Sequence, residues 1–275
     1  MSSSAARLRD IDAPLVLPAD APLSQHIGIG AGFRRSINLE RDHGAVELLQ
    51  GYVPTSRALA ALEQLADGLA GDAAGRALAL IGPYGAGKSA FALFAGALLG
   101  PPDAAGKDVA DAKLRTAAPG LAERLNAANQ GSRGLLRVQV NGIPDSLTRQ
   151  LLLALARAAA QAALPATLVK RIGAAARPGT RMDHVIGLIV QTRSAWTNAG
   201  GRGVLIELDE LGKLLEFEAQ GGGRSEIHLL QLLAEKAAEP GDAPLCVLVL
   251  LHQALEHYGA RLGKTLRDEW KKVQG

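Results

Sequence analysis

The chain has 275 residues and a formal net charge of +3, with 48% hydrophobic, 21% charged and 3% aromatic residues. This composition is ordinary for a globular protein and allows one large α/β domain or two small ones. Its basic residues are scattered, so charge gives no general argument for a nucleic acid partner. The single cysteine, Cys246, excludes an internal disulfide and is expected to be a small buried residue in a reducing compartment.

The N-terminal sequence does not indicate a targeting signal. Residues 1–7 lack the apolar core of a signal peptide. The apolar stretch 151–164 is interrupted by Arg157 and Gln161, and is too short and too polar to span a bilayer. We therefore expect a cytoplasmic protein without a membrane segment. The richness in alanine, glycine, leucine and arginine indicates a bacterial genome of high G+C content.

Residues 1–42 contain Pro14, Pro18 and Pro22 and few periodic apolar residues, so they are expected to form an extended lead-in, and residues 43–275 the folded core. In chain order, the apolar patterns predict a helix at 55–69 capped by Thr55, a strand at 77–81, a helix at 90–99, a connection with short helical patterns at 101–133, a strand at 135–140, helices near 146–163, 166–176 and 183–199, a strand at 204–208, a helix at 225–238, a strand at 245–251 and a helix at 253–273. Strands that alternate with helices predict an α/β fold with a mostly parallel sheet between two helical layers.

The segment Gly82-Pro-Tyr-Gly-Ala-Gly-Lys88-Ser89 fits G-x-x-x-x-G-K-[ST] between a predicted strand and a predicted helix. In this motif the backbone N–H groups surround phosphate oxygens, the lysine reaches the β- and γ-phosphates, and the serine holds Mg²⁺. The alternative is a glycine-rich turn with a surface lysine, which the strand and helix context disfavours. We expect ATP and Mg²⁺ as cofactors. The predicted nucleotide-binding residues of this segment are Gly82, Pro83, Tyr84, Gly85, Ala86, Gly87, Lys88, Ser89 and Ala90.

Two adjacent carboxylates, Asp209 and Glu210, end the apolar strand predicted at 204–208. After a phosphate loop, this is where an aspartate holds Mg²⁺, so Ser89 and Asp209 are the predicted metal ligands. Glu210 would then orient and deprotonate the attacking water. The alternative is that the pair opens a helix, since acidic residues favour a helical first turn.

Several segments together resemble the AAA+ ATPases, in particular the branch that includes origin-recognition-like and STAND-type proteins. These segments are Gly51-Tyr-Val-Pro-Thr-Ser-Arg57, the phosphate loop, Asn141 after the second strand, and Asp209-Glu210. More narrowly, Asp209-Glu-Leu-Gly-Lys-Leu-Leu-Glu-Phe217, Leu250-Leu-His-Gln253 and residues 269–275 look like large bacterial ATP-binding proteins found in phage-defence neighbourhoods. The resemblance covers about residues 45–275.

The resemblance implies the strand order 5-1-4-3-2 and a polar residue after the fourth strand that senses the γ-phosphate. Gln253 is the first candidate for this residue and His252 the second; the alternative is that they cap the last helix. It also implies that Tyr52 and Pro54 pack against adenine, with ordinary helix packing as the alternative. A fifth strand and a helical lid follow in that family, so we expect a core truncated before them. Arg261 and Arg267 on the last predicted helix are candidates for an arginine finger, and the alternative is that they are ordinary solvated residues.

Three functions remain open at this stage. The first is an ATP-hydrolysing module that remodels or assembles a partner, with Lys88, Glu210, Gln253 and His252 as catalytic candidates. The second is a nucleotide-operated switch with little turnover. The third, a P-loop kinase, is disfavoured because Glu210 beside Asp209 suits water activation better. ATP, further copies of the chain or other subunits are the expected partners, and DNA is left open.

Overall fold

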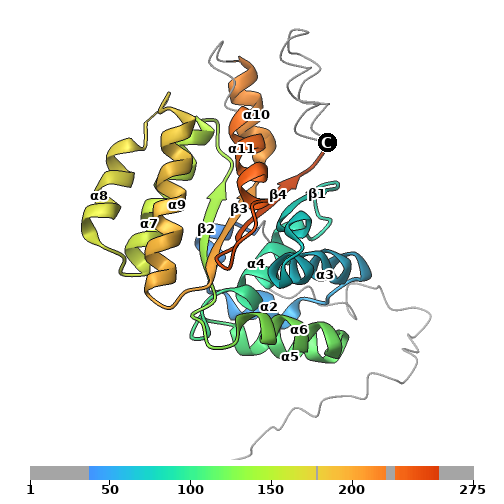
Figure 1. Cartoon of the computed structure of the whole chain (residues 1–275). Helices are drawn as coiled ribbons and strands as arrows, with labels where there is room; N and C mark the ends of the chain where they lie inside the picture. Colours follow the sequence, from blue (N-terminus) through green and yellow to red (C-terminus); the bar gives the residue numbers. More distant parts are fainter. Residues whose placement is uncertain (1–36, 178, 221–226, 254–275) are drawn as a thin grey trace, which may run out of the picture. The chain divides into compact units, whose positions relative to one another are not determined.

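The computed structural model describes residues 37–177, 179–220 and 227–253 (Figure 1). In these ranges the strands form one parallel sheet in the order β1-β4-β3-β2. They are β1 (Ala77–Ile81), β2 (Leu135–Asn141), β3 (Gly203–Asp209) and β4 (Leu245–Leu251). Each predicted strand agrees with its observed bounds to within one residue, and the order agrees with the 1-4-3-2 portion of the implied one.

The helices alternate with the strands, as predicted. In the described ranges they are α1 (Leu39–Asp42), α2 (Val46–Gly51), α3 (Ser56–Ala70), the 3₁₀ turn η3 (Ala73–Arg76), α4 (Lys88–Leu99), α5 (Lys107–Ala117), α6 (Pro119–Asn129), α7 (Leu147–Gln161), α8 (Ala166–Ala175), α9 (Met182–Asn198), α10 (Leu211–Gln220) and α11 (Ile227–Ala237). The chain is therefore an α/β protein in this part.

Local sequence explains where these helices start. Thr55 precedes α3, and its hydroxyl accepts a hydrogen bond from the Ala58 N–H at 3.3 Å, as expected of an N-cap. Ser146 caps α7 in the same way by accepting from the Arg149 N–H. Helix α10 was not assigned from sequence. It follows β3 directly because Leu211, Leu214 and Leu215, at helical spacing, are all buried against the core.

Helices cover both faces of the sheet because alternate residues of each strand face opposite sides. On one side, Val204, Ile206 and Leu208 of β3 join a core with α7 to α11. On the other side, Leu205 joins a core built with α1 to α6. Figure 1 shows α7, α8 and α9 on one side and α2 to α6 on the other. Strand β3 is buried along its whole length, as a central parallel strand must be.

The packed core begins earlier in the chain than the expected boundary at residue 43. Leu39 in α1 is fully buried, and its N–H donates to Asn141 Oδ1 at 3.1 Å at the end of β2. Asn141 Nδ2 in turn donates to Asn38 Oδ1 at 2.9 Å. Residues 38–42 thus belong to the core because they bond to the end of a strand and fill the α4 side of the sheet.

Strand β1 is an edge strand within the described ranges, where it pairs with β4 alone. Its last residue, Ile81, has a side chain that is 52% exposed, as expected at the edge of a sheet. Several expectations lie outside the described residues. They are the extended lead-in over residues 1–36, the helix expected after Gln253, the truncation before a fifth strand and lid, and the arginines Arg261 and Arg267. None of the helices in the described ranges combines the length and apolar character that crossing a bilayer requires.

Cys246 offers a test of the core. It is fully buried in β4, and burial raises the pKa of its thiol to about 12. We expect the folded protein to resist a thiol reagent at pH 8, because the thiolate is the reactive form. Full labelling is expected in denaturant, measured by intact mass. Rapid labelling without denaturant would contradict the placement of β4 in the core.

Candidate functional site

The glycine loop (residues 82–89) connects the end of β1 to α4. Gly85 and Gly87 have φ values of +79° and +82°, which side-chain-bearing residues rarely adopt. An added Cβ would meet no atom at either glycine, so the backbone conformation and not space requires them. Gly87 precedes α4 without a side-chain cap, which leaves the first-turn N–H groups without intrahelical partners. The loop is therefore a suitable anion-binding helix terminus.

Lys88 lies folded onto its own loop. Its ammonium donates to the carbonyl oxygens of Gly82 at 2.6 Å and Pro83 at 2.9 Å. Burial lowers the pKa of Lys88, and the nearby Asp209 carboxylate acts in the opposite direction. A phosphate would have to compete with these two carbonyl contacts for the cation.

Asp209, at the end of β3, lies beside the start of α4. Burial raises the pKa of Asp209, while the Ser89 hydroxyl, the Glu210 N–H and the Lys88 ammonium favour its charged form. Asp209 Oδ1 accepts from the Glu210 N–H at 2.8 Å. Asp209 Oδ2 is buried and receives no hydrogen bond of good geometry from the described residues. The parallel sheet thus brings together Lys88, Ser89 and Asp209, as predicted from sequence.

The donor set of Ser89 and Asp209 fits Mg²⁺. Asp209 Oδ2, to which no described residue donates a hydrogen bond of good geometry, and the nearby Ser89 hydroxyl offer two oxygen ligands of the kind that this ion takes. Mg²⁺ usually keeps several waters and phosphate oxygens, so two protein ligands are enough. In the residues that the structure describes, no group of three or more His, Cys, Asp or Glu side chains forms an all-protein metal site.

Glu210 adopts an unusual backbone conformation, with φ of +49°. Non-glycine residues in this region are uncommon and concentrate at functional sites. Gly142, just after β2, fixes the conformation by close approach. Its N–H donates to the Asp209 carbonyl at 2.8 Å, and a Cβ on Gly142 would lie 2.1 Å from the Glu210 carbonyl oxygen. The Glu210 carboxylate forms an ion pair with Lys213 in the first turn of α10.

His252 is the residue after β4 that meets the glycine loop. Its ring stacks on Tyr84, with centroids 4.8 Å apart and planes at 19°. Just before it, the Leu251 carbonyl accepts from the Gly82 N–H at 3.1 Å. Gln253, the first candidate for phosphate sensing, is half-buried one position further on. The sensing role of either residue stays a prediction.

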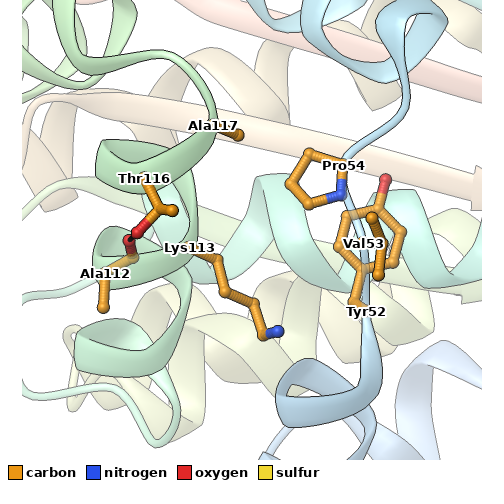
Figure 2. Close-up of a pocket in the computed structure, with 7 residues that line it drawn as sticks. All are labelled: Tyr52, Val53, Pro54, Ala112, Lys113, Thr116 and Ala117. Atoms are coloured by element: carbon orange, nitrogen blue, oxygen red, sulfur yellow. Dashed lines mark hydrogen bonds between the residues drawn. The ribbon is translucent and has the colours of Figure 1, made fainter. Parts of the chain in front are cut away.

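Tyr52 lies in a different place from the glycine loop. Its ring is buried and packs on Phe94 of α4 at 4.7 Å, and burial raises its pKa to about 12. Figure 2 shows an open pocket of about 400 Å³ beside it, between residues 52–54 and α5. The pocket-lining residues are Tyr52, Val53, Pro54, Ala112, Lys113, Thr116 and Ala117. No loop residue lines this pocket, so adenine contact by Tyr52 stays a prediction beside its observed packing role.

A buried ion pair lies beneath α4. Arg137 of β2 donates to both carboxylate oxygens of Glu207 on β3, at 3.1 and 3.3 Å. Glu207 is fully buried, which raises its pKa, and Arg137 opposes this. An added Cβ at Gly96 of α4 would lie 2.2 Å from the guanidinium, so the helix rests directly on this pair. Glu207 and Asp209 share one face of β3 because they are two residues apart.

A scan of protein-family models, a search of curated proteins and a search of solved structures each returned no match to this chain.

Sequence reasoning missed Gly142, Lys213 and the Arg137–Glu207 pair. Glu207 carried a signal, because a charged residue in an otherwise apolar strand needs a buried partner. Nothing in the sequence context of Lys213 distinguishes it from an ordinary surface lysine. Gly142 follows a strand, where a glycine usually marks only a turn.

Replacing Gly142 by alanine should disturb the Asp209–Glu210 turn. The new Cβ would collide with the Glu210 carbonyl, so we expect a loss of about 1–3 kcal/mol in the free energy of unfolding. Denaturant unfolding measures it. Gly173→Ala in α8, where an added Cβ meets nothing, is the control and should be neutral or stabilising by about 0.5–1 kcal/mol. Equal effects of the two variants would contradict the close approach.

The Arg137–Glu207 pair should be costly to break on one side only. Arg137→Met would leave a buried, unpaired carboxylate, and we expect a loss of about 3–5 kcal/mol in stability. The double variant Arg137→Met/Glu207→Leu removes both charges and should recover much of that loss. Thermal or denaturant unfolding of the wild type, Arg137→Met, Glu207→Leu and the double variant completes the cycle. Additive losses would show that the two side chains do not interact.

Proposed function

We propose that this chain is an ATP-binding, Mg²⁺-dependent ATP-hydrolysing module. One observation carries the proposal: the ammonium of Lys88, the hydroxyl of Ser89 and the buried carboxylate of Asp209 converge where a glycine loop opens a helix. A loop cation, an oxygen ligand from the loop and an acid from a neighbouring strand are the parts that phosphoryl transfer by P-loop enzymes requires.

The chain's own residues take separate parts in the proposed reaction. The loop N–H groups and Lys88 bind the phosphates, and Ser89 and Asp209 hold the metal. Mg²⁺, when bound, neutralises charge that develops on the phosphates. Glu210, one residue beyond Asp209, orients the attacking water and accepts its proton. His252 follows the neighbouring strand and lies against the loop through Tyr84.

The strand order β1-β4-β3-β2 supports an AAA+-like core for this module. We propose that it works within a larger bacterial protein, where nucleotide state governs assembly or remodelling of a partner. Further copies of the chain or other subunits are the proposed partners. A role in phage defence and an action on DNA are extensions of this proposal that rest on the resemblance alone.

A switch with little turnover is the second candidate. The ion pair between Glu210 and Lys213 favours it, because the carboxylate that would contact the attacking water is engaged by an ammonium. Steady-state turnover with and without a partner, such as DNA, separates a switch from a continuously working ATPase.

Lys88→Ala should weaken ATP binding. Loss of a charge-assisted contact of roughly 1.5–3 kcal/mol corresponds to a drop of about ten-fold or more in affinity. Calorimetry with Mg²⁺ and ATP measures it, with Lys170→Ala on the exposed side of α8 as the control. Unchanged ATP affinity in Lys88→Ala would overturn the assignment of the loop.

The two carboxylates should fail in different ways. Glu210→Gln is expected to bind Mg²⁺–ATP at least as tightly as the wild type and to slow hydrolysis by about 10²–10⁴-fold, the usual loss on removing a general base. Asp209→Asn should weaken Mg²⁺-dependent binding and turnover together, because a metal ligand loses its charge. Binding and phosphate release should be measured on the full assembly. Equal hydrolysis by wild type and Glu210→Gln would redirect the assignment to a kinase or a binding-only switch.

A further inference from the structure

Lys213 is a second cation at the candidate site. It lies in the first turn of α10, where its backbone N–H donates to the Glu210 carbonyl at 3.0 Å. Its ammonium pairs with Glu210 Oε2. The Lys213 and Glu210 side chains are 43% and 38% exposed, so the pair is open to solvent and to a ligand. Exposed pairs of this kind are weak and are readily exchanged for a better partner.

The surroundings of Lys213 belong to the proposed nucleotide site. Tyr84 of the glycine loop and Asp209 both lie close enough to influence the pKa of Lys213, which is raised chiefly by its hydrogen bond with Glu210. Tyr84 is 69% exposed and stacks on His252, so its side of the loop faces solvent. Because the parallel strands β1 and β3 end at the same edge of the sheet, Lys213, four residues after β3, lies at the edge that carries the glycine loop.

The backbone of Glu210 is fixed by its neighbours, and its side-chain carboxylate is engaged in the ion pair with Lys213. The close approach of Gly142 fixes the main chain. In the part of the chain that the structure describes, Lys213 is the recorded ion-pair partner of the Glu210 carboxylate. The group that would activate water is therefore occupied by a movable cation, and releasing it requires moving one lysine side chain.

We propose that Lys213 is a phosphate-responsive latch on Glu210. Without nucleotide its ammonium pairs with Glu210; with ATP bound it moves to the γ-phosphate and leaves the carboxylate to the attacking water. This inference rests on the proposed function. It assigns to the terminal phosphate a second cation besides Lys88, and it makes the general base available only when that phosphate is present.

The test compares ATP with ADP, because ADP has no γ-phosphate. Lys213→Met should lower Mg²⁺–ATP affinity about ten-fold, the usual effect of losing one charge-assisted contact, and leave ADP affinity within about two-fold. Lys213→Arg should retain most of the preference for ATP. A purely structural role for Lys213 would change both nucleotides alike. Calorimetry on the full chain provides the affinities.

A double-mutant cycle tests the exchange of partners. Glu210→Gln removes the competitor for Lys213 and should tighten ATP binding in the wild-type background. That gain should vanish in Lys213→Met, because the cation that profits from it is absent. If the gain persisted there, it would come from general repulsion between carboxylate and phosphate, and the latch would be overturned.

Lys236 provides a matched control. It forms an ion pair with Glu239 at the same i,i+3 spacing, near the amino end of β4 and away from the loop. Lys236→Met should leave both nucleotide affinities unchanged. If Lys213→Met bound ATP as tightly as the wild type does, and ADP likewise, the latch would be overturned but the proposed function would remain intact. Absence of any Mg²⁺–ATP binding by the wild type would overturn both.

Discussion

Parallel pairing of the buried strand β3 between β2 and β4 is the constraint on which the candidate site depends. The register aligns Asn141 with Asp209 and, through β4, brings the end of β1 to the same edge. Because every residue of β3 is buried, a slip by one position would turn its apolar residues from one core to the other. The register that fills both cores is also the one that aims Asp209 at the loop.

Burying carboxylates on β3 carries a desolvation cost, which nearby cations and a hydroxyl offset. Glu207 and Asp209 put two carboxylates on one face of a buried strand, where desolvation penalises both. Arg137 neutralises the first by a bidentate contact, and Lys88 and Ser89 lie beside the second. The absence of a side chain at Gly96 lets α4 lie on the Arg137 guanidinium. The helix that begins at the glycine loop is therefore seated on the ion pair below it.

The site combines a fixed backbone with movable cations. The loop glycines, the Glu210 turn and Gly142 hold main-chain geometry that few other residues could adopt. Lys88 and Lys213, in contrast, are held by two carbonyl oxygens and by an exposed carboxylate, the contacts that a phosphate would displace in the proposed function. Such a division suits catalysis, because a preorganised frame lowers the reorganisation needed when the ligand binds.

The sequence by itself determined the strands, most helices, and the residues at the loop and at the end of β3. These follow from local rules, namely apolar periodicity, the Thr55 and Ser146 caps, and a glycine pattern typical of a phosphate-binding loop. The adenine contact of Tyr52, which the resemblance implies, stays a prediction, and the fold adds the packing of its ring on Phe94.

Only the tertiary structure decided the partners of single side chains. Arg137 with Glu207, His252 with Tyr84, and Gly142 against Glu210 each join segments that lie far apart in the chain. Lys213 is a neighbour of Glu210 in sequence, yet its meaning depends on the loop from β1 arriving beside it. Residue patterns report the local backbone, but a contact between distant segments exists only after the register of the sheet and the packing of α4 have set their distance.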